Sequence, residues 1–319
     1  MFVGLPLEGR VCALSRATGA EVGALPAPPE GFRLPFVLHQ LGPGRLGVLD
    51  AGGLPSPSPF VPVSPTIHEY HYALDASGTL RAEHVRSVDF AAAHIGFAED
   101  FAPLPGGGYV LSDAVLGALW VVAHDGALTC ALSAADGAPL ACSADMAPID
   151  VGGVPFAFSG HTVPGVSPLA VRGDLLYFYV PSAGALFSLP LSSLHDDRTP
   201  RARIADLRKV SDKPANVAVE QLLGLAVRPD APDDLHIYAA DSLQLSVVRI
   251  DPASGRREVV AADPSLFAFP SSLAFVPGAS GGSLVVVSNQ QHLTPLTNHA
   301  LADERFVLPY LVTELPLLG

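Results

Sequence analysis

A short unit of two apolar runs joined by a turn recurs along the chain. In GGGYVLSDAVLGALWVVAHDG (106–126), a Gly-rich turn leads into an apolar run that ends at Asp113, and a second run ends at Asp125-Gly126. Comparable first runs occur in four further segments: 41–52, 170–191, 228–255 and 277–289. Runs of Val, Leu, Ile, Tyr and Phe between Gly- and Pro-rich turns are typical of β-strands, so the sequence predicts an all-β chain.

The spacing of these runs predicts the architecture. They end at Asp50, Asp113, Pro181, Asp241 and Ser288, which lie 63, 68, 60 and 47 residues apart. Repeats of roughly 40 to 60 residues, each holding several strands, indicate the blades of a β-propeller. No segment has a sustained helical period of 3.6 residues, so we expect little helix.

Five blade cores are recognised in this way, and the two ends of the chain supply the sixth. The stretch 10–27 contains only the second half of the unit, and RFVLPYLVTEL (305–315) can supply a strand. Joining both ends in one blade closes the ring and leaves no exposed sheet edge. The sequence therefore predicts a single domain, 1–319, folded as a six-bladed β-propeller whose last blade is closed by N- and C-terminal strands.

The aspartates that end three of the runs are expected to be structural. Asp50, Asp113 and Asp241 each stand where a strand stops and a turn begins. An aspartate at that place commonly accepts hydrogen bonds from nearby backbone N–H groups.

Composition argues against several classes of partner. The net charge is −13 and the basic residues are scattered, so nucleic acid and anionic membrane surfaces are not expected partners. No apolar segment approaches the roughly 18 to 20 residues of a membrane span, and the N-terminus lacks the pattern of a signal peptide. The three cysteines fit neither a disulfide framework nor a zinc site. A cytoplasmic location is the expectation.

The blade rhythm resembles the six-bladed propellers of the SMP-30/gluconolactonase-like group, and three stretches resemble the major royal jelly/yellow proteins. FVGLPLEGRV (2–11) is similar to the opening strand of the yellow type. RLGVLDAG (45–52) is similar to its LWVLDTG segment, with Gly47 in place of the tryptophan, and LVVVSNQQ (284–291) is similar to a late strand. The likeness spans nearly the whole chain and implies a propeller fold.

The same resemblance suggests where a metal site would lie. Lactonases of the SMP-30 group hold a divalent metal through one Glu, two Asn and one Asp, each just before an innermost strand, a set of oxygen ligands that suits calcium. The matching positions here are Glu99-Asp100, Val166-Ser167, Glu220-Gln221 and Pro270-Ser271. None of the three asparagines falls there, so we predict no cofactor, with calcium or another divalent metal as the alternative. Glu99 and Glu220 could project into the channel as an acid/base pair, or bond loop backbone.

Two histidines lie close together in the strand-like run IHEYHYAL (67–74). In a strand, His68 and Tyr70 share one face while His71 points to the other, so the two histidines do not form a joint metal site. His68 or Tyr70 could supply the polar contacts of a pocket.

A long Gly/Pro/aromatic loop, GGVPFAFSGHTVPGVSP (152–168), leads into a predicted inner strand, where propellers place ligand contacts. His161, near its end, could act as a general acid or base near neutral pH, or lie in solvent. Phe156, Phe158 and Phe269 also precede predicted inner strands, so they could floor an apolar pocket or belong to the core.

Further polar residues are candidates for contact with a ligand. Asn289 and His292 follow a late apolar strand in SNQQHLTP (288–295), where they could reach a ligand or simply satisfy a loop. Asp100, Gln221 and Ser271 stand at the predicted inner-strand positions and would line the same channel mouth.

These residues favour an enzyme and leave two alternatives open. The predicted function is metal-independent cyclisation or isomerisation of a hydrophobic small metabolite at the channel mouth, with Glu99, His161 and Glu220 as catalytic residues and positioning as the main contribution. The alternatives are a divalent-metal-dependent lactonase of the SMP-30 type and a non-catalytic propeller that binds a small ligand. GLPSPSPFVPVSPT (53–66) is an irregular segment that could cap the channel.

Overall fold

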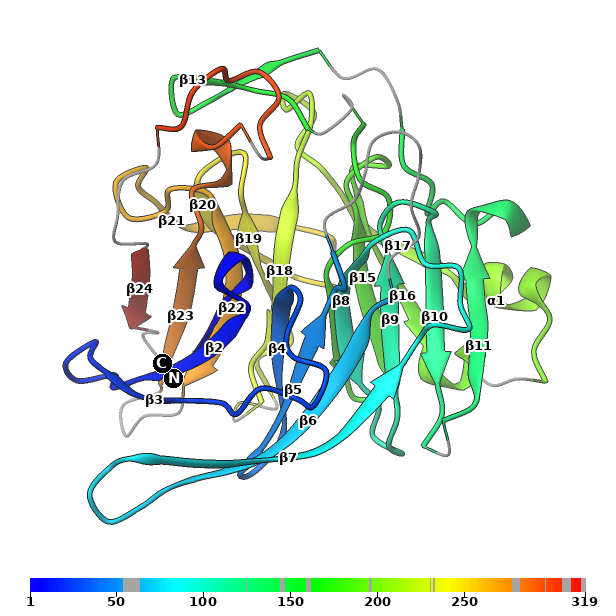
Figure 1. Ribbon diagram of the computed structural model, residues 1–319. Helices are drawn as coiled ribbons and strands as arrows, with labels where there is room; N and C mark the ends of the chain where they lie inside the picture. Colours follow the sequence, from blue (N-terminus) through cyan, green and yellow to red (C-terminus); the bar gives the residue numbers. More distant parts are fainter. Residues whose placement is uncertain are drawn as a thin grey trace. The chain divides into compact units, whose positions relative to one another are not determined.

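The computed structural model confirms a six-bladed β-propeller (Figure 1). It describes eleven stretches of the chain: 1–53, 64–124, 126–143, 147–158, 162–194, 197–229, 231, 233–276, 282–295, 297–305 and 311–316. The chain divides into two compact units, Met1–Cys130 and Ala131–Gly319, and each is described by itself. That the chain is a single domain stays a prediction. No helix in the described stretches is long and apolar enough to cross a membrane.

The first unit holds three antiparallel sheets. The first sheet contains β1 (Phe2–Leu5), β2 (Arg10–Leu14) and β3 (Glu21–Ala24), with the 3-10 turn η1 (Pro6–Glu8) between the first two strands. The second contains β4 (Pro35–Gly42), β5 (Arg45–Asp50), β6 (Thr66–Leu74) and β7 (Leu80–Asp89). The third contains β8 (Ala98–Pro103), β9 (Tyr109–Asp113), β10 (Ala118–Val122) and β11 (Leu128–Ser133), whose last residues lie across the boundary of the unit.

The second unit holds three blade sheets and one small hairpin. The hairpin contains β12 (Ile149–Val151) and β13 (Val154–Phe156), after the 3-10 turn η2 (Ala134–Asp136). The first blade sheet contains β14 (Leu169–Arg172), β15 (Leu175–Val180), β16 (Ala185–Pro190) and β17 (Arg208–Asp212), with η4 (Leu191–Leu194) and α1 (Pro200–Asp206) before its last strand. The other two contain β18 (Leu222–Val227), β19 (Ile237–Asp241), β20 (Ser246–Ile250) and β21 (Arg257–Ala262), then β22 (Pro270–Val276), β23 (Ser283–Ser288) and β24 (Leu311–Pro316), with η5 (Gln291–Leu293) before β24.

The strand pairing at the two chain ends is more local than the sequence predicted. We expected N- and C-terminal strands to share the last blade. Among the described strands, β24 pairs with β23, and β1 pairs with β2 in a sheet that is completed by β3. The ends of the chain therefore lie in separate ladders.

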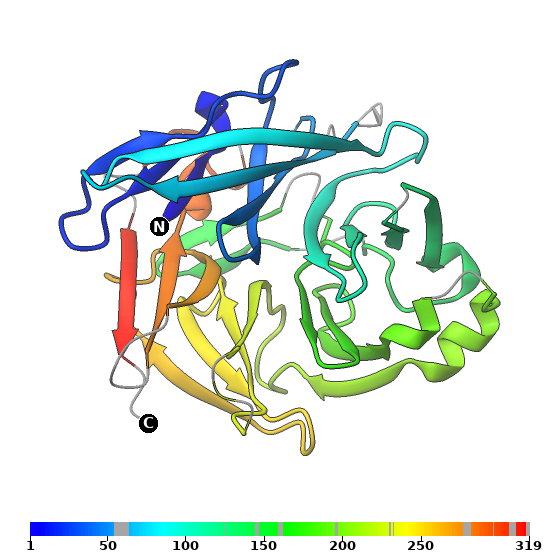
Figure 2. The ribbon, with the colours of Figure 1, turned by 90° about the horizontal axis from the view of Figure 1, so that it is seen from below.

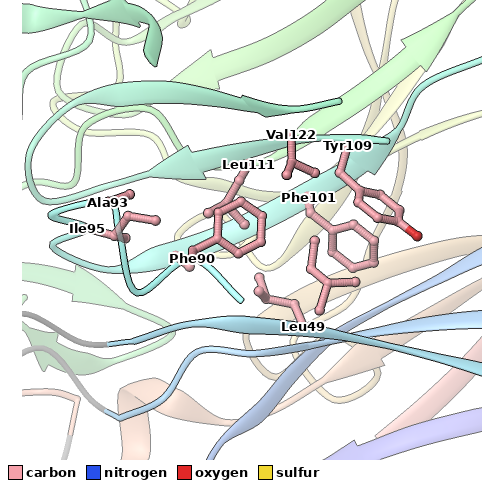
Figure 3. Close-up of a cluster of buried hydrophobic side chains, with 10 residues drawn as sticks. Leu49, Phe90, Ala93, Ile95, Phe101, Tyr109, Leu111 and Val122 are labelled. Carbon is pink, nitrogen blue, oxygen red and sulfur yellow. The ribbon is translucent and has the colours of Figure 1, made fainter. Parts of the chain in front are cut away.

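Apolar side chains fill the space between neighbouring blades of each unit. In the first unit, Leu49, Phe101 and Leu111 are fully buried in a cluster between the second and third sheets, with Phe90 and Ile95 from the connection between them (Figure 3). The first sheet packs against the long β6–β7 hairpin through a second cluster, and the two lie side by side in Figure 2. In the second unit, comparable clusters lie between successive blade sheets.

The glycine that departs from the yellow-type motif has a steric reason. Gly47 lies on β5, and the ring of Phe101 from the neighbouring blade packs directly on it. A Cβ atom at position 47 would lie 2.9 Å from Cζ of Phe101, closer than packed carbon atoms approach. Phe101 thus occupies the space in which a larger side chain at position 47 would lie.

Asp113 and Asp50 accept backbone hydrogen bonds, as the sequence predicted for strand-end aspartates. Asp113 is fully buried, and its carboxylate accepts hydrogen bonds from the backbone N–H groups of Gly96, Phe97, Val115 and Leu116 at 2.8–3.1 Å. Two of these donors precede the innermost strand β8, and two belong to the turn after β9. The carboxylate therefore ties the start of one strand to the end of the next.

Asp50 forms the equivalent tie in the preceding blade. Its carboxylate accepts hydrogen bonds from the N–H groups of Arg33, Leu34 and Gly52 at 2.6–2.9 Å. Asp241 keeps the turn half of the pattern, with a hydrogen bond of 3.2 Å from the N–H of Gln244.

Replacement of Asp113 by alanine should destabilise the chain strongly. The change leaves four backbone donors without their acceptor in a buried place, and we expect the free energy of unfolding to fall by more than about 3 kcal/mol. Asp113→Asn keeps one acceptor oxygen and should lose less. Denaturant unfolding followed by circular dichroism measures both. Asp251→Ala is the matched control, because Asp251 bonds the N–H of Ala253 in an exposed turn; equal losses for both alanine variants would contradict the structural role.

Candidate functional site

A hollow of about 380 Å³ in the second unit is lined by two buried acidic residues and an arginine, together with other side chains. We call it the Asp241 hollow. It is lined by twelve residues: Pro214, Asn216, Val217, Glu220, Asp241, Gln244, Ser246, Val248, Arg257, Glu258, Val259 and Ala262. Glu220, predicted from the sequence to be catalytic, is one of them.

Glu220 is held by two partners inside the unit. It precedes β18 and is only 1% exposed. Its Oε2 atom accepts a hydrogen bond of 2.6 Å from the hydroxyl of Tyr179 on β15, and Nη1 of Arg257 on β21 donates to both carboxylate oxygens. The partners of Glu220 are therefore side chains of two blades rather than the loop backbone.

The arginine of this pair is itself fixed. Nε of Arg257 donates to Oγ of Ser211 at 2.8 Å, and the guanidinium carbon lies 6.0 Å from the centre of the Tyr179 ring. Nη2 of Arg257 is buried and has no hydrogen-bond partner in the part of the chain that the structure describes. A buried guanidinium N–H without an acceptor costs free energy, and here it belongs to a residue that lines the hollow.

Asp241 ends β19 beside this pair and is 2% exposed. Burial, followed by the negative charge of Glu220, raises the pKa of the Asp241 carboxyl to about 7. A carboxyl with such a pKa is present in both protonation states near neutral pH, which is what a general acid or base requires. The ion-paired Glu220 and the titrating Asp241 thus give the hollow two carboxyl groups in different environments.

The pairing of neighbouring strands places Asp241 beside two other residues that line the hollow. Asp241 pairs with Ser246 on β20, and Ser246 pairs with Ala262 on β21, so the three residues form one rung across the blade. The hollow opens at this rung, where the strands reach their turns. Val217, Val248 and Val259 give its walls an apolar part, so it can take a ligand with both polar and apolar groups.

The other residues predicted for the channel mouth of this unit are placed as follows. Gln221 is buried, its carbonyl oxygen accepts a hydrogen bond from the N–H of Ser242, and its Oε1 atom has no partner within the described stretches. The Ser271 hydroxyl donates to the carbonyl oxygen of Val287 at 3.3 Å. Neither lines the Asp241 hollow.

The aromatic residues predicted as a pocket floor are packed in a buried cluster. Phe156, Phe158 and Phe269 contact one another at ring-centroid distances of 4.9 and 5.4 Å, and the cluster is completed by residues such as Val163 and Leu245. They form a core between the β12–β13 hairpin and the segments beneath it.

His292 and Asn289 lie beside this cluster. The buried ring of His292 stacks on Phe269 with centroids 5.5 Å apart, and burial lowers the pKa of His292 to about 4, so it is uncharged at neutral pH. Oδ1 of Asn289 accepts a hydrogen bond of 3.2 Å from the N–H of Gln291.

The predicted residues of the first unit lie in two places. Glu99 is half-buried on β8, next to Asp100, whose carboxylate contacts Nε2 of His39 at 2.9 Å. His68 is buried and lines a second hollow, and the hydroxyl of Tyr70 donates to the carbonyl oxygen of Pro26 at 3.0 Å. His161 and residues 54–63 of the suggested cap lie outside the described residues.

Three residues of the Asp241 group were not predicted as functional from the sequence. Asp241 was expected to be structural only. Tyr179 and Arg257 lie in β15 and β21, and their positions in the sequence carry no sign of a functional role. A signal was present, since Asp241 and Glu220 are acidic residues at the ends of consecutive inner strands of one blade. That they affect each other depends on burial, which the pattern does not reveal.

Within the described stretches, no three His, Cys, Asp or Glu side chains form a group that could hold a metal ion. The predicted absence of a cofactor and its divalent-metal alternative both stay predictions.

Comparison with known proteins gives a likeness of fold. No family model matches the chain, and no curated protein matches it. Among solved structures, it is similar to a chain of a nidogen/laminin complex, with 12% identity, a TM-score of 0.50, and coverage of 90% of this chain and 84% of that one. It also matches a streptogramin B lyase (10% identity, TM-score 0.48, 100% and 79% covered) and virginiamycin B lyase from Staphylococcus aureus (12% identity, TM-score 0.44, 97% and 78% covered). Likenesses this distant extend to the fold alone. The resemblance to SMP-30 and yellow-type proteins therefore holds at the level of the propeller fold.

The raised pKa of Asp241 should make stability depend on pH. A carboxyl whose pKa is higher in the folded than in the unfolded chain contributes stability at low pH that is lost as the pH rises from about 4 to about 7. Asp241→Asn removes this contribution. The free energy of unfolding of the variant, minus that of the wild type, should therefore rise across this range by up to about 1.4 kcal/mol per pH unit.

Urea unfolding at several pH values from 4.5 to 8 measures the difference. Asp251→Asn is the control, because hydrogen bonds in its exposed turn lower the pKa of Asp251 and so give no such rise near neutrality. Parallel curves for Asp241→Asn and the wild type would show that Asp241 does not titrate in this range.

Proposed function

We propose that this chain is an enzyme that binds a small, partly apolar carbonyl compound in the Asp241 hollow and promotes isomerisation or cyclisation by proton transfer. The observation that carries the proposal is the juxtaposition of Asp241, with its pKa near neutrality, and the ion pair of Glu220 with Arg257 in one hollow of about 380 Å³. Two carboxyl groups placed in different environments are a common arrangement for acid/base chemistry.

Each group has a role that its contacts support. Asp241 donates or accepts the proton. The positive charge of the Arg257 guanidinium, which Glu220 holds in place, stabilises negative charge that develops on a substrate oxygen. The valine side chains of the wall contact the apolar part of the substrate.

The hollow differs from the channel-mouth site that the sequence predicted. Glu220 belongs to both. Glu99 belongs to the first unit, and His161 lies outside the described residues, so the proposal assigns them no role. Non-catalytic binding of a small ligand in the same hollow is the alternative that the geometry also supports.

Exchange of carbon-bound hydrogen is a direct test of proton transfer. Cyclohexanone, 2-tetralone and δ-valerolactone would be incubated with the full chain in D₂O at neutral pH, and NMR would follow the loss of the proton next to the carbonyl group. We expect faster exchange than in buffer for at least one probe, and a loss of about 100-fold or more of that acceleration in Asp241→Asn.

Controls separate the proposal from its alternatives. Asp251→Asn, outside the hollow, should exchange at the wild-type rate. Saturable binding of these probes without exchange would favour the non-catalytic alternative. Exchange that is lost with EDTA and restored by Ca²⁺ would favour the metal-dependent one, and unchanged exchange in Asp241→Asn would contradict the role of Asp241.

A further inference from the structure

A second hollow, of about 350 Å³, lies in the first unit and differs in chemistry from the Asp241 hollow. We call it the His68 hollow. It is lined by nine residues: Glu30, Gly31, Arg33, Asp50, Ser64, Thr66, His68, Ser87 and Asp89. All lining residues except Gly31 have polar side chains, and none has an aliphatic or a phenyl side chain.

The two hollows occupy the same place in their own blades. Asp50 pairs with Thr66 and Thr66 with Asp89, which is the rung that corresponds to Asp241, Ser246 and Ala262. In each blade the rung joins the ends of the second and fourth strands to the start of the third. The two blades therefore carry the same corner with different side chains on it.

The polar groups of the His68 hollow are already oriented. Oγ of Ser87 contacts Nδ1 of His68 at 2.9 Å and donates to Oε1 of Glu30 at 3.2 Å. Phe32 packs edge-on against the buried His68 ring with centroids 5.6 Å apart. Burial lowers the pKa of His68, so the ring is uncharged at neutral pH and adds no positive charge to the hollow.

The floor of the hollow is rigid because Asp50 is part of the tie described above, with both carboxylate oxygens bonded to backbone N–H groups. Asp89 bonds the N–H of Ala91 through Oδ1. Arg33 also lines the hollow and is exposed. The carboxylates of Asp50 and Asp89 are thus held before binding and lose little entropy when a ligand arrives.

From this lining we infer that the His68 hollow is a second binding site, independent of the proposed function, for a small neutral molecule rich in hydroxyl groups. Hydroxyls both donate and accept, so they can match carboxylates, an arginine, an imidazole and serine or threonine hydroxyls at once. An apolar ligand would leave these groups unpaired, and an anion would face the carboxylates of Glu30, Asp50 and Asp89. A quaternary ammonium ion would offer no hydrogen bond to the serine, threonine and histidine side chains of the lining.

Saturation-transfer NMR with the full chain tests the inference. The probes are myo-inositol and D-glucose, with cyclohexanol, tetramethylammonium and acetate as apolar, cationic and anionic comparisons. We expect saturable signals from at least one of the two polyols and none from the comparisons. Arg33→Gln removes the positive charge and part of the donor capacity of the lining, and Asp89→Asn removes a negative charge; each should weaken polyol binding by about tenfold or more.

Two control variants make the result decisive. Arg81→Gln changes an exposed arginine near the tip of the same hairpin, which pairs with Asp75, and should bind polyols like the wild type. Asp241→Asn should also bind them normally, even where it abolishes hydrogen exchange, so this site and the proposed function can fail separately. The inference is overturned by the absence of polyol signals, by binding that is unchanged in both Arg33→Gln and Asp89→Asn, or by binding of a comparison compound in place of the polyols.

Discussion

The bond on which the rest of the structure depends is the one between a buried strand-end carboxylate and the backbone of its own blade. Asp50 and Asp113 each satisfy N–H groups at the start of the innermost strand and in the turn after the second strand. These donors lie where no strand partner is available, so a side chain must supply the acceptor. With this edge of the blade fixed, the apolar faces of neighbouring sheets can pack together, as Leu49, Phe101 and Leu111 do.

The two hollows lie at the same corner of their blades, beside the strand-end aspartates Asp50 and Asp241. A blade rung begins at the tied aspartate and continues to the outer strands, and both hollows open along it. The backbone at this corner is held in place, whereas the residues on the third and fourth strands are free to differ. The His68 hollow has a lining without aliphatic side chains. The Asp241 hollow has valine side chains beside Asp241, Glu220 and Arg257.

The sequence was sufficient for the fold and for part of the site. Alternating turns and apolar runs predicted the blades, and the position of Asp113 at the end of a run predicted its backbone bonds, because both depend on local chemistry. The sequence pattern does not predict that the pKa of Asp241 lies near neutrality. That pKa depends on the burial of Asp241 and on the nearby negative charge of Glu220. Phe156 and Phe269 show the converse limit: an aromatic residue in a loop is compatible with either a pocket or a core, and only the packing of the β12–β13 hairpin decides between them.

The short reach of the aspartate ties has a consequence for how the chain becomes ordered. The bonds from Gly96 and Phe97 to Asp113 span 17 and 16 residues, and the bond from Leu34 to Asp50 spans 16. Closing loops of this size costs little more entropy than closing a hairpin, and contacts between near neighbours in the sequence form quickly. Each of these corners can therefore assemble during synthesis, while the second unit has yet to leave the ribosome.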